Sequence, residues 1–400
     1  MPLRPWLIVG TATRALAQAA ARHGHAVCAI DAYADRDTLQ ACEGRVLRLD
    51  LGPDERFAPP AHALARGPCE RRFAPAGLRG IVAGNGLDGD LAARAVLERT
   101  APVCGCDAAT VRRLRDPLAW SGLLDRIGAP HPDTRFDAPP APAGWLVKSD
   151  RGTGGLHVRR WRARAAVAPG GYFQRHVAGR PASLLFCADG ARTWPIGWQW
   201  QRLAPTPELA WRYGGVMTAP DLGPGLRKAA WHWLQRIAGE VPLRGVGSLD
   251  FLVEGDQLQL LELNPRPTAS VALYPGIDIF GLHVAPAAHV APPRPAHVAP
   301  ACGETIFYAG APLSVAAHHD WPPWCADLPA SATDFAAGDA VCTVQASAAT
   351  VRGLRLRLAH RLHHLARSLA GAQTQDESRD KQLPSQRKHP GASPGRVAAG

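Results

Sequence analysis

The stretch Leu260-Leu-Glu-Leu-Asn-Pro-Arg-Pro267 ends an apolar run with a carboxylate and an amide two positions apart. Residues i and i+2 of a strand point to the same face, so Glu262 and Asn264 are expected to converge. A second apolar run upstream carries Asp250, and Gly255-Asp256 between the two runs is a hairpin turn signal. Such a hairpin would gather three oxygen ligands beside the arginine of the quoted stretch. Hard oxygen ligands of this kind suit Mg²⁺ held together with substrate phosphates.

A lysine and a glycine-rich loop form the second chemical feature. The run Trp145-Leu-Val-Lys148 predicts a short strand, the segment 149–155 predicts a loop, and Leu156-His-Val158 is expected to resume the strand. Backbone N–H groups of a glycine loop can lie over phosphates, and Lys148 would add a point charge. A lysine in an apolar strand is costly unless it has an anionic partner, which favours a binding role.

The N-terminus predicts a parallel, doubly wound unit. A strand over Trp6–Gly10, a helix over Thr13–His23 and a strand over Ala26–Ile30 make one β-α-β unit. Asp31 follows the second strand, about where a ribose-binding acid would stand. The second and third glycines of G-x-G-x-x-G are absent, however. This absence argues against the alternative of a nicotinamide-dependent oxidoreductase. That alternative would also leave the Asp250 cluster without a role.

The C-terminal third shows a change in composition. A Pro/Ala-rich linker is expected over 285–301, and strands over Glu304–Ala309 and Ala340–Gln345 predict a small β module. Upstream of these, Tyr213-Gly-Gly215 is expected to be a loop on the substrate side. Leucines spaced by three and four from Val351 onward predict a basic amphipathic helix, and a disordered tail is expected from Gln373.

Length and composition limit which other classes of protein are possible. A chain of 400 residues is expected to form two or three domains, and no apolar run reaches the roughly 20 residues of a membrane span. Nine cysteines without C-x-x-C pairs argue against a disulfide framework or a zinc site. The net charge of +11 allows a nucleic-acid-binding protein, but residues 351–400 contain no Phe, Tyr or Trp for stacking. A cytoplasmic protein with no nucleic-acid or membrane partner is expected.

Taken in order, these motifs resemble the ATP-grasp enzymes. The matching pieces are the Rossmann-like lead unit, the Lys148 strand with its loop, Gln174-Arg-His-Val-Ala-Gly179, the Gly247-Ser-Leu-Asp250 strand and the Glu262 stretch. The stretches Trp324–Pro329 and Gly338–Val344 resemble the C-terminal part of biotin-carboxylase-like members. The chain is most similar to the predicted ATP-dependent carboligase branch found beside tetrahydromethanopterin and methanofuran genes.

The resemblance implies a fold class and a domain plan. The class is α/β, with α+β in the central domain: an ATP-grasp fold with an N-terminal Rossmann-like preATP-grasp domain and a small C-terminal β module. The implied domains are 1–112 (preATP-grasp), 113–285 (ATP-grasp, with an N-lobe over 113–175 and a C-lobe over 176–285), 286–372 (β module and basic helix) and 373–400 (tail).

The resemblance also implies roles for individual residues. Lys148 would bind the ATP phosphates, and Arg266 would face the transferred phosphoryl group or the substrate carboxylate; these two are the expected catalytic residues. The expected metal ligands for Mg²⁺, with Mn²⁺ as an alternative ion, are Asp250, Glu262 and Asn264. The remaining expected nucleotide contacts are Gly152, Thr153, Gly154, Gly155, Gln174, Arg175, His176 and Val177.

Two departures from the family pattern stand out. Many members carry glutamate where this chain has Asp250, and an upstream lysine that often meets the α-phosphate is replaced by Arg113 or Arg115. Both changes keep the charge, so an active enzyme is expected. The implied activity is amide formation between a small-molecule carboxylate and an amine through an acyl phosphate, in the making of a one-carbon-carrying cofactor. The substrates, carboxyphosphate chemistry as an alternative, and the oligomeric state, a homodimer included, stay open.

Overall fold

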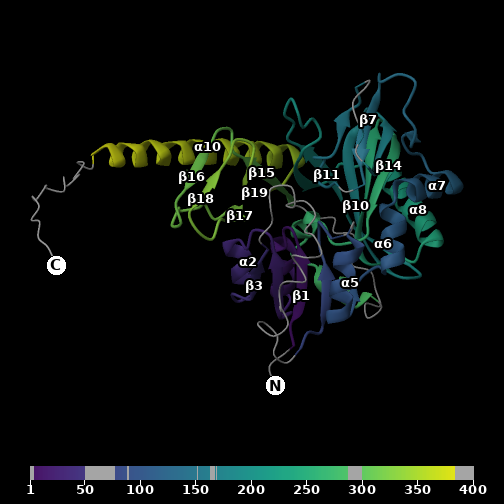
Figure 1. Cartoon of the computed structure of the whole chain (residues 1–400), viewed down its shortest axis with the longest axis horizontal. Coiled ribbons are helices and arrows are strands. Elements are labelled where there is room, and N and C mark those ends of the chain that lie inside the picture. The colour runs from purple at the N-terminus through teal and green to yellow at the C-terminus, as the bar shows by residue number, and fades with distance from the viewer. Residues whose placement is uncertain are drawn as a thin grey trace, which may run out of the picture.

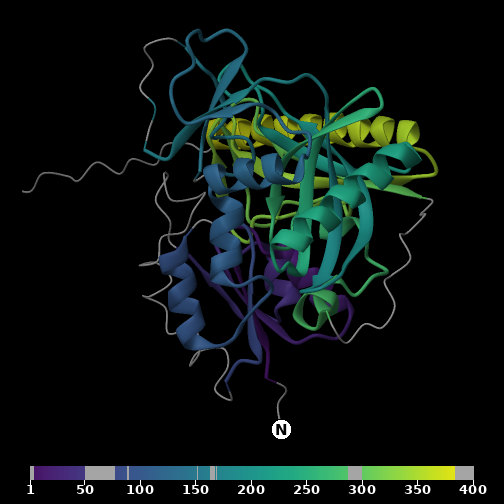
Figure 2. The same cartoon turned by 90° about the vertical axis from the view of Figure 1, so that its right-hand side faces the viewer.

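The computed structural model describes residues 4–49, 77–87, 90–150, 152–162, 167, 169–286 and 300–382, with side chains up to residue 370. A parallel sheet with helices lies at one end of the molecule, a large antiparallel sheet forms the middle, and a smaller antiparallel sheet lies at the opposite end (Figures 1 and 2). This mixed architecture confirms the predicted α/β class. The domain limits stay a prediction.

The N-terminal unit is a parallel sheet in the order β3-β2-β1-β4-β5. It forms because short apolar runs, buried on both faces, alternate with helices, which is the pattern of a doubly wound sheet. Its strands are β1 (Trp6–Gly10), β2 (Val27–Asp31), β3 (Val46–Arg48), β4 (Gly80–Ala83) and β5 (Val103–Cys104), and its helices are α1 (Arg14–Arg22), α2 (Arg36–Ala41) and α5 (Leu91–Thr100).

Two helices join this unit to the rest of the chain, α6 (Ala108–Arg115) and α7 (Pro117–Ile127). They are separated only by Asp116, whose carboxylate accepts the N–H of Leu118 at 2.8 Å and so caps α7. Pro117 occupies the first turn, where no N–H is needed. The sharp break fixes where the end of α6 points, which matters for Arg115.

The central sheet is antiparallel in the order β14-β13-β10-β11-β12-β15-β19-β17. One face of this sheet packs on α7, α8 and α10 through the largest apolar cluster. On the other face, α9 lies against β13, and α1 packs on α9 and the 3₁₀ turn η1. The elements are β10 (Arg180–Asp189), β11 (Thr193–Leu203), β12 (Tyr213–Thr218), β13 (Arg244–Glu254), β14 (Gln257–Asn264), β15 (Ala301–Tyr308), β17 (Cys325–Ala326), β19 (Ala340–Ala348), α8 (Pro224–Glu240), η1 (Ala269–Leu273), α9 (Ile279–Val284) and α10 (Val351–Gln382).

Two smaller sheets complete the fold. One is four-stranded in the order β6-β9-β7-β8, and the other pairs β16 with β18. The strands are β6 (Thr134–Arg135), β7 (Trp145–Ser149), β8 (Arg159–Arg160), β9 (Gly171–Arg175), β16 (Leu313–Val315) and β18 (Thr333–Phe335). The strands expected in a terminal module, β15 and β19, extend the central sheet because β15 pairs with β12.

Two local predictions are wrong. Tyr213-Gly-Gly215 begins strand β12 instead of forming a loop. Gly215 is needed there because it has φ +133°, and a Cβ on it would lie 2.2 Å from the carbonyl oxygen of Glu304 on β15. Leu156–Val158 does not resume a strand: the N–H of Val158 donates to the Gly155 carbonyl at 3.2 Å, which closes a turn, and pairing restarts at Arg159.

The predicted tail is wrong in part. Helix α10 runs through residues 373–382, which were expected to be disordered, and extends outward from the body of the molecule (Figure 1). Residues 383–400 lie outside the described residues, as does most of the predicted linker, over 287–299. Among the described helices, none has the length and apolar character needed to cross a bilayer.

A buried arginine connects the N-terminal unit to the far end of the chain. Arg14 on α1 donates to both carboxylate oxygens of Asp327, at 2.8 and 3.0 Å, and lies 3.4 Å from Glu304 on β15. Burial and the neighbouring charge of Asp327 raise the pKa of Asp35 to about 9. Arg14 thus offsets an acidic cluster at an interface between segments about 300 residues apart in sequence.

We expect Arg14→Met to lower the free energy of unfolding by about 3–5 kcal/mol, because it leaves buried carboxylates without their cation. Urea unfolding of the full chain measures this effect. The matched control is Arg22→Ala, on the same helix but exposed, which should change stability by about 0.5 kcal/mol or less. Equal effects of the two substitutions would contradict the interface role of Arg14.

Candidate functional site

The site is built on the β13–β14 hairpin. Asp250 lies directly opposite Glu262, and Ser248 directly opposite Asn264, so all four side chains share one face of the sheet. The hydroxyl of Ser248 donates to Asp250 Oδ1 at 2.8 Å, and Asn264 Nδ2 donates to Asp250 Oδ2 at 3.3 Å. The structure therefore brings the three expected metal ligands together.

Arg266 lies at the end of this row. Its Nη2 donates to Asn264 Oδ1 at 3.3 Å, and its side chain is buried. Strand β14 ends at Asn264, just before Pro265, whose ring nitrogen cannot donate a ladder hydrogen bond. Arg266 therefore lies beside the amide of the expected ligand set, as the sequence predicts.

The pKa values of the two carboxylates shift in opposite directions. Burial and the nearby charge of Glu262 raise the pKa of Asp250 to about 7. Burial also opposes ionisation of Glu262, but Arg115, Lys148, His157 and Arg266 outweigh it and lower the pKa of that carboxyl. Two adjacent, half-buried carboxylates cost free energy that a divalent cation would offset.

The donor set fits magnesium better than a transition metal. No group of three or more His, Cys, Asp or Glu side chains in the described ranges is arranged to hold a metal ion. Two carboxylates and an amide oxygen are the sparse, all-oxygen set with which Mg²⁺ is held when phosphates and water complete its shell.

Lys148 reaches the site from the four-stranded sheet. It lies on β7 opposite Tyr172 of β9, and its Nζ donates to Gln174 Oε1 at 3.0 Å. Gln174 in turn donates to Thr134 Oγ1 at 3.3 Å, so its side chain holds the ammonium group in place. The structure places Gln174 beside Lys148, an arrangement that the sequence did not predict.

The segment expected to contact adenine lies where β9 leaves the small sheet. Arg175 stacks on Trp145, with its Cζ 5.4 Å from the ring centroid, and the N–H of His176 donates to the Gly144 carbonyl at 2.8 Å. Val177 follows before β10 begins. These residues connect the two antiparallel sheets, and their role toward a nucleotide stays a prediction.

The glycine loop packs down onto the β11–β12 connection. The N–H of Tyr213 donates to the Gly154 carbonyl at 2.9 Å. Gly155 has φ +73°, and a Cβ on it would lie 1.9 Å from the carbonyl oxygen of Trp211. A Cβ on Gly152 would lie 1.9 Å from the ring of His157. Glycine is therefore required for close packing at two points of this loop. Thr153 lies between these glycines.

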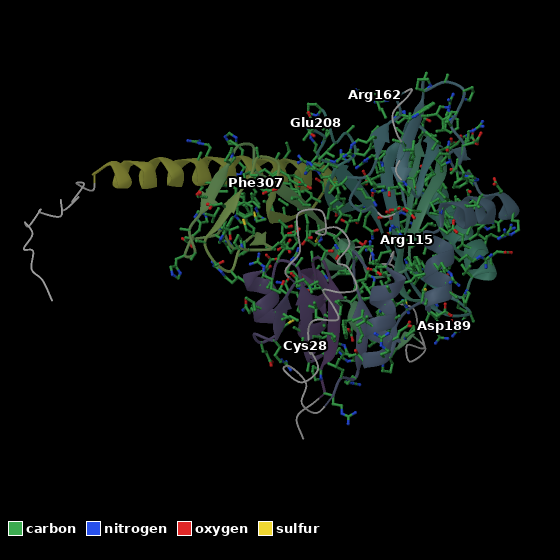
Figure 3. All side chains as sticks on the ribbon, viewed as in Figure 1. Cys28, Arg115, Arg162, Asp189, Glu208 and Phe307 are labelled. Atoms are coloured by element: carbon green, nitrogen blue, oxygen red, sulfur yellow. The ribbon has the colours of Figure 1, made fainter. Side chains whose placement is uncertain are left out.

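Arg115 is the upstream arginine that reaches the loop. It extends from the end of α6, where the N-terminal unit meets the central sheet (Figure 3), and its Nη2 donates to the Asp150 and Gly152 carbonyls at 3.2 and 3.4 Å. Arg113, the other candidate, donates to the Glu240 carbonyl at 2.7 Å, away from the loop. The geometry therefore favours Arg115.

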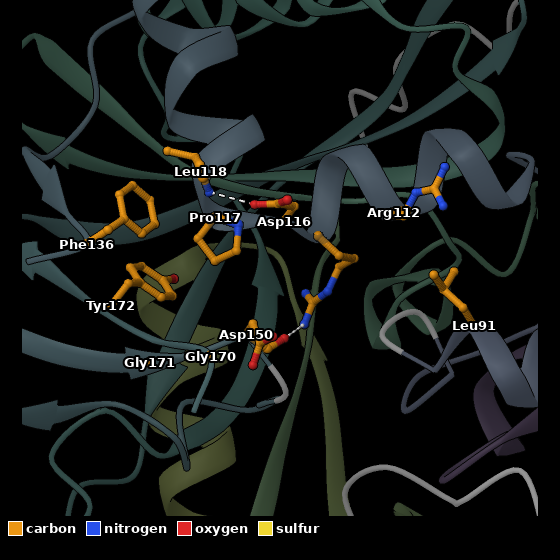
Figure 4. A pocket seen from close by; sticks show the side chains of 11 residues that line it. Leu91, Arg112, Asp116, Pro117, Leu118, Phe136, Asp150, Gly170, Gly171 and Tyr172 are labelled. Atoms are coloured by element: carbon orange, nitrogen blue, oxygen red, sulfur yellow. Dashed lines mark hydrogen bonds between the residues drawn. The ribbon is translucent and has the colours of Figure 1, made fainter. Parts of the chain in front are cut away.

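A pocket of about 350 Å³ opens beside Arg115 and Asp150. Phe136 and Tyr172, stacked with their centroids 6.3 Å apart, form one wall, and Arg112 lies on the other side (Figure 4). Among the residues that the sequence singles out for the site, Arg115 alone lines this pocket. Tyr172, the cross-strand neighbour of Lys148, links it to the carboxylate face.

Sequence reasoning missed His157. Its ring lies against Gly152 within the loop turn, and burial lowers its pKa to about 4 despite the opposing charge of Glu262. No local pattern marks this residue, because it reaches Glu262 only through the fold of the loop. The ring adds a polar wall to the site.

Asp31 is not available to a dinucleotide. One of its oxygens accepts from the N–H and hydroxyl of Thr13, at 2.6 and 2.8 Å, and the other from the N–H groups of Tyr33 and Ala34, at 2.7 and 2.8 Å. These four bonds brace the turns after β1 and β2. The residue that would have supported a nicotinamide site is a structural one.

A family model described as an ATP-grasp domain matches residues 119–270. That range contains Lys148, the glycine loop, the Gln174 segment and the carboxylate hairpin. Residues 119–270 form an ATP-grasp domain. No curated protein matches the chain in a sequence comparison.

Solved structures share the fold well beyond this domain. N5-carboxyaminoimidazole synthase from Aspergillus clavatus, in complex with ADP and 5-aminoimidazole ribonucleotide, is 12% identical with a TM-score of 0.63, covering 90% of this chain and 99% of that one. The biotin carboxylase domain of Hydrogenobacter thermophilus 2-oxoglutarate carboxylase, with MgADP and bicarbonate, is 14% identical with a TM-score of 0.66, covering 87% of each chain.

Pyruvate carboxylase from Rhizobium etli is 15% identical with a TM-score of 0.66, and 89% of this chain matches 38% of that one. The chain therefore spans well under half of that larger protein. At these identities the likeness shows the fold. It places the N-terminal parallel sheet and the antiparallel sheets of the ATP-grasp domain in the arrangement found in the known enzymes.

We expect Gly155→Ala to release the glycine loop, because its Cβ would meet the Trp211 carbonyl. Hydrogen exchange should become faster at the amides of Tyr213 and Val158, which donate to the loop. The control is Gly154→Ala: it also has positive φ, but the nearest atom to its Cβ is 3.9 Å away. Exchange that rises equally in both variants would show that backbone strain, and not packing on Trp211, holds the loop.

Proposed function

We propose that the protein is an ATP- and magnesium-dependent ligase that joins a carboxylate to an amine through an acyl phosphate. The observation that carries the proposal is the Asp250–Glu262 pair: two half-buried carboxylates opposite each other, near the positive charges of Lys148, Arg115 and Arg266. A cation and a polyphosphate together would satisfy both sets of charges.

Asp250, Glu262 and Asn264 would hold Mg²⁺, or Mn²⁺ in its place. An ion bound there would neutralise charge on the oxygens of the transferred phosphoryl group. The hydrogen bonds to Asp250 from Ser248 and Asn264 orient that carboxylate before any ion arrives, which reduces the cost of assembling the site.

Lys148 would place its ammonium group on the ATP phosphates. Its contact with Gln174 fixes the direction of the side chain, and the glycine loop would cover the phosphates with backbone N–H groups. Arg115, which now donates to loop carbonyls, would add charge at the same point. Phosphoryl transfer depends on this positioning and charge stabilisation more than on a protein nucleophile.

The chemistry proceeds in two balanced steps. A carboxylate oxygen of the first substrate attacks the γ-phosphorus, and the bond to the β-phosphate oxygen breaks, giving an acyl phosphate and ADP. The amine nitrogen then attacks the acyl carbon, phosphate leaves with the C–O bond electrons, and the nitrogen loses a proton. Arg266, buried beside Asn264, would hold the acyl phosphate oxygens.

The comparisons with solved structures support an adenine nucleotide as a substrate. They leave open which molecule accepts the phosphoryl group. The titles of two similar structures print ADP or MgADP, and one adds bicarbonate. Bicarbonate in place of an organic carboxylate would make the intermediate a carboxyphosphate. The resemblance of the sequence to the carboligase branch supports a narrower proposal, a step in making a one-carbon carrier of the methanofuran or tetrahydromethanopterin type.

We expect ADP formation that depends on both a carboxylate and an amine, and a loss of about 10²–10³ in kcat in Glu262→Gln and in Lys148→Met. The assay measures ADP and AMP separately over a panel of carboxylates, bicarbonate and amines. The exposed residues Glu254 and Lys228 provide matched controls, Glu254→Gln and Lys228→Met, which should keep full turnover. Full turnover in both site variants would disprove the assignment.

Nucleotide binding should depend on magnesium. We expect ADP to raise the melting temperature with Mg²⁺ present and to raise it far less after chelation with EDTA. Glu262→Gln should remove the difference between the two conditions, whereas Glu254→Gln should preserve it. An ADP effect that is independent of the ion in the wild-type protein would contradict the proposed role of the carboxylate pair.

A further inference from the structure

A buried histidine lies where the N-terminal unit meets the central sheet. His283 of α9 is 2% exposed, and two glycines leave room for its ring. A Cβ on Gly105, in the segment between β5 and α6, would lie 2.9 Å from the ring Cε1. A Cβ on Gly245 of β13 would lie 2.8 Å from the ring Nδ1. The ring is therefore held in one place by backbone from both parts of the molecule.

The hydrogen bond of this ring shows which nitrogen carries the proton. Nδ1 accepts the N–H of Val246 on β13 at 3.0 Å, so it has no proton of its own. Burial lowers the pKa of His283 to about 4, against the opposing effect of the backbone at Cys104 and Val246, so the ring is neutral at pH 7. A neutral imidazole has one N–H group, which makes Nε2 the donor.

That donor makes no hydrogen bond to any residue in the part of the chain that the structure describes. A buried N–H group without an acceptor is costly, and native structures avoid this cost by pairing the group with protein or with ordered water. The position of His283 therefore calls for an acceptor at Nε2.

A cavity of about 20 Å³ adjoins the ring. Its walls include Ala83 and Gly84 at the end of β4, together with Cys104, His283 and Arg266. One water molecule needs a cavity of about 10–15 Å³, so this volume is enough for it. Because the space is so small, a water there would contact both the histidine and the arginine.

Two hydrogen bonds of Arg266 are long. Its Nη2 lies 3.3 Å from Asn264 Oδ1 and its Nη1 lies 3.4 Å from the Pro267 carbonyl oxygen, beyond the usual range of about 2.7–3.2 Å. Both acceptors are also within two residues of the arginine in sequence, so neither bond ties its side chain to another element. A contact through His283 would tie it to α9.

We propose that His283 is a positioning residue for Arg266, and that its Nε2–H donates to a buried water which also accepts an N–H of the arginine. The two lone pairs of the water oxygen match these two donors. The link would fix the direction of the guanidinium from α9, which packs on β13 and on α1 of the N-terminal unit. The inference rests on the proposed function only in the role of Arg266 toward the acyl phosphate.

The first test needs no turnover. A crystal structure of the full chain, at a resolution that shows ordered water, should contain a water oxygen within about 3.2 Å of both His283 Nε2 and an Arg266 nitrogen. A cavity without a water, or a water that contacts only one of the two side chains, would overturn the proposal whatever the activity of the protein.

The second test uses two substitutions that separate the ring nitrogens. Glutamine places an amide N–H group near the position of Nε2, and asparagine places an amide oxygen near that of Nδ1. His283→Gln therefore keeps the donor to the water and loses the bond to Val246, whereas His283→Asn keeps that bond and loses the donor. Each variant loses one buried hydrogen bond, so both should melt at a lower temperature than the wild-type protein.

We expect His283→Asn to lower kcat about tenfold and His283→Gln to retain most of it, at a temperature where both variants are folded. KM for ATP and the Mg²⁺-dependent melting shift with ADP should be unchanged in both, because Lys148 and the carboxylate pair would make those contacts.

Two kinetic results would overturn the proposal. Equal losses of kcat in the two variants would indicate a structural role for His283, and wild-type kcat in His283→Asn would show that Arg266 is held without the water. A wild-type protein that makes no ADP would instead count against the proposed function, while the water in the crystal would still support the link from His283 to Arg266.

Discussion

The fold keeps two half-buried carboxylates side by side, where water reaches them only in part. Asp250 and Glu262 are opposite each other on β13 and β14, and burial opposes the ionised form of both. The surrounding residues respond to this cost: Ser248 and Asn264 donate to Asp250, while Lys148, Arg115 and Arg266 bring positive charge toward Glu262. A site that is expensive to maintain without ligands is suited to bind a cation and phosphates tightly.

The remaining architecture positions the positive groups around that pair. The break at Asp116 directs Arg115 toward the glycine loop, and the β7–β9 pairing sets Lys148 beside Gln174. Strand β10 of the central sheet pairs with β13 and so fixes the position of the hairpin. At the other side of the same sheet, Arg14 of α1 contacts Glu304 of β15 and Asp327, which joins the N-terminal unit to the C-terminal part of the chain. Each charged residue of the site thus depends on a different element, so the site exists only when these elements are assembled.

The sequence predicts the local features of this arrangement well. The hairpin, its turn and the convergence of Asp250, Glu262 and Asn264 follow from period-two alternation, and the β-α-β start follows from apolar runs and helix patterns. What it misses depends on contacts between distant segments. Gly214 and Gly215 look like a loop, because the close approach of Leu203 and Ala204 to the first and of β15 to the second appears only in the fold. His157 reaches Glu262 through a turn that no pattern marks, and Arg115 is distinguished from Arg113 by its contact with Asp150 and Gly152.

The central claim is that the carboxylate pair holds the ion that accompanies the nucleotide. The most direct measurement is the anomalous diffraction of Mn²⁺ in crystals grown with ADP. The account predicts a manganese peak about 2.0–2.3 Å from oxygens of Glu262 and Asp250, with the phosphates on the Lys148 side. ADP bound elsewhere, such as at the carboxyl ends of β1 and β2, or a manganese peak that does not touch Glu262, would contradict it.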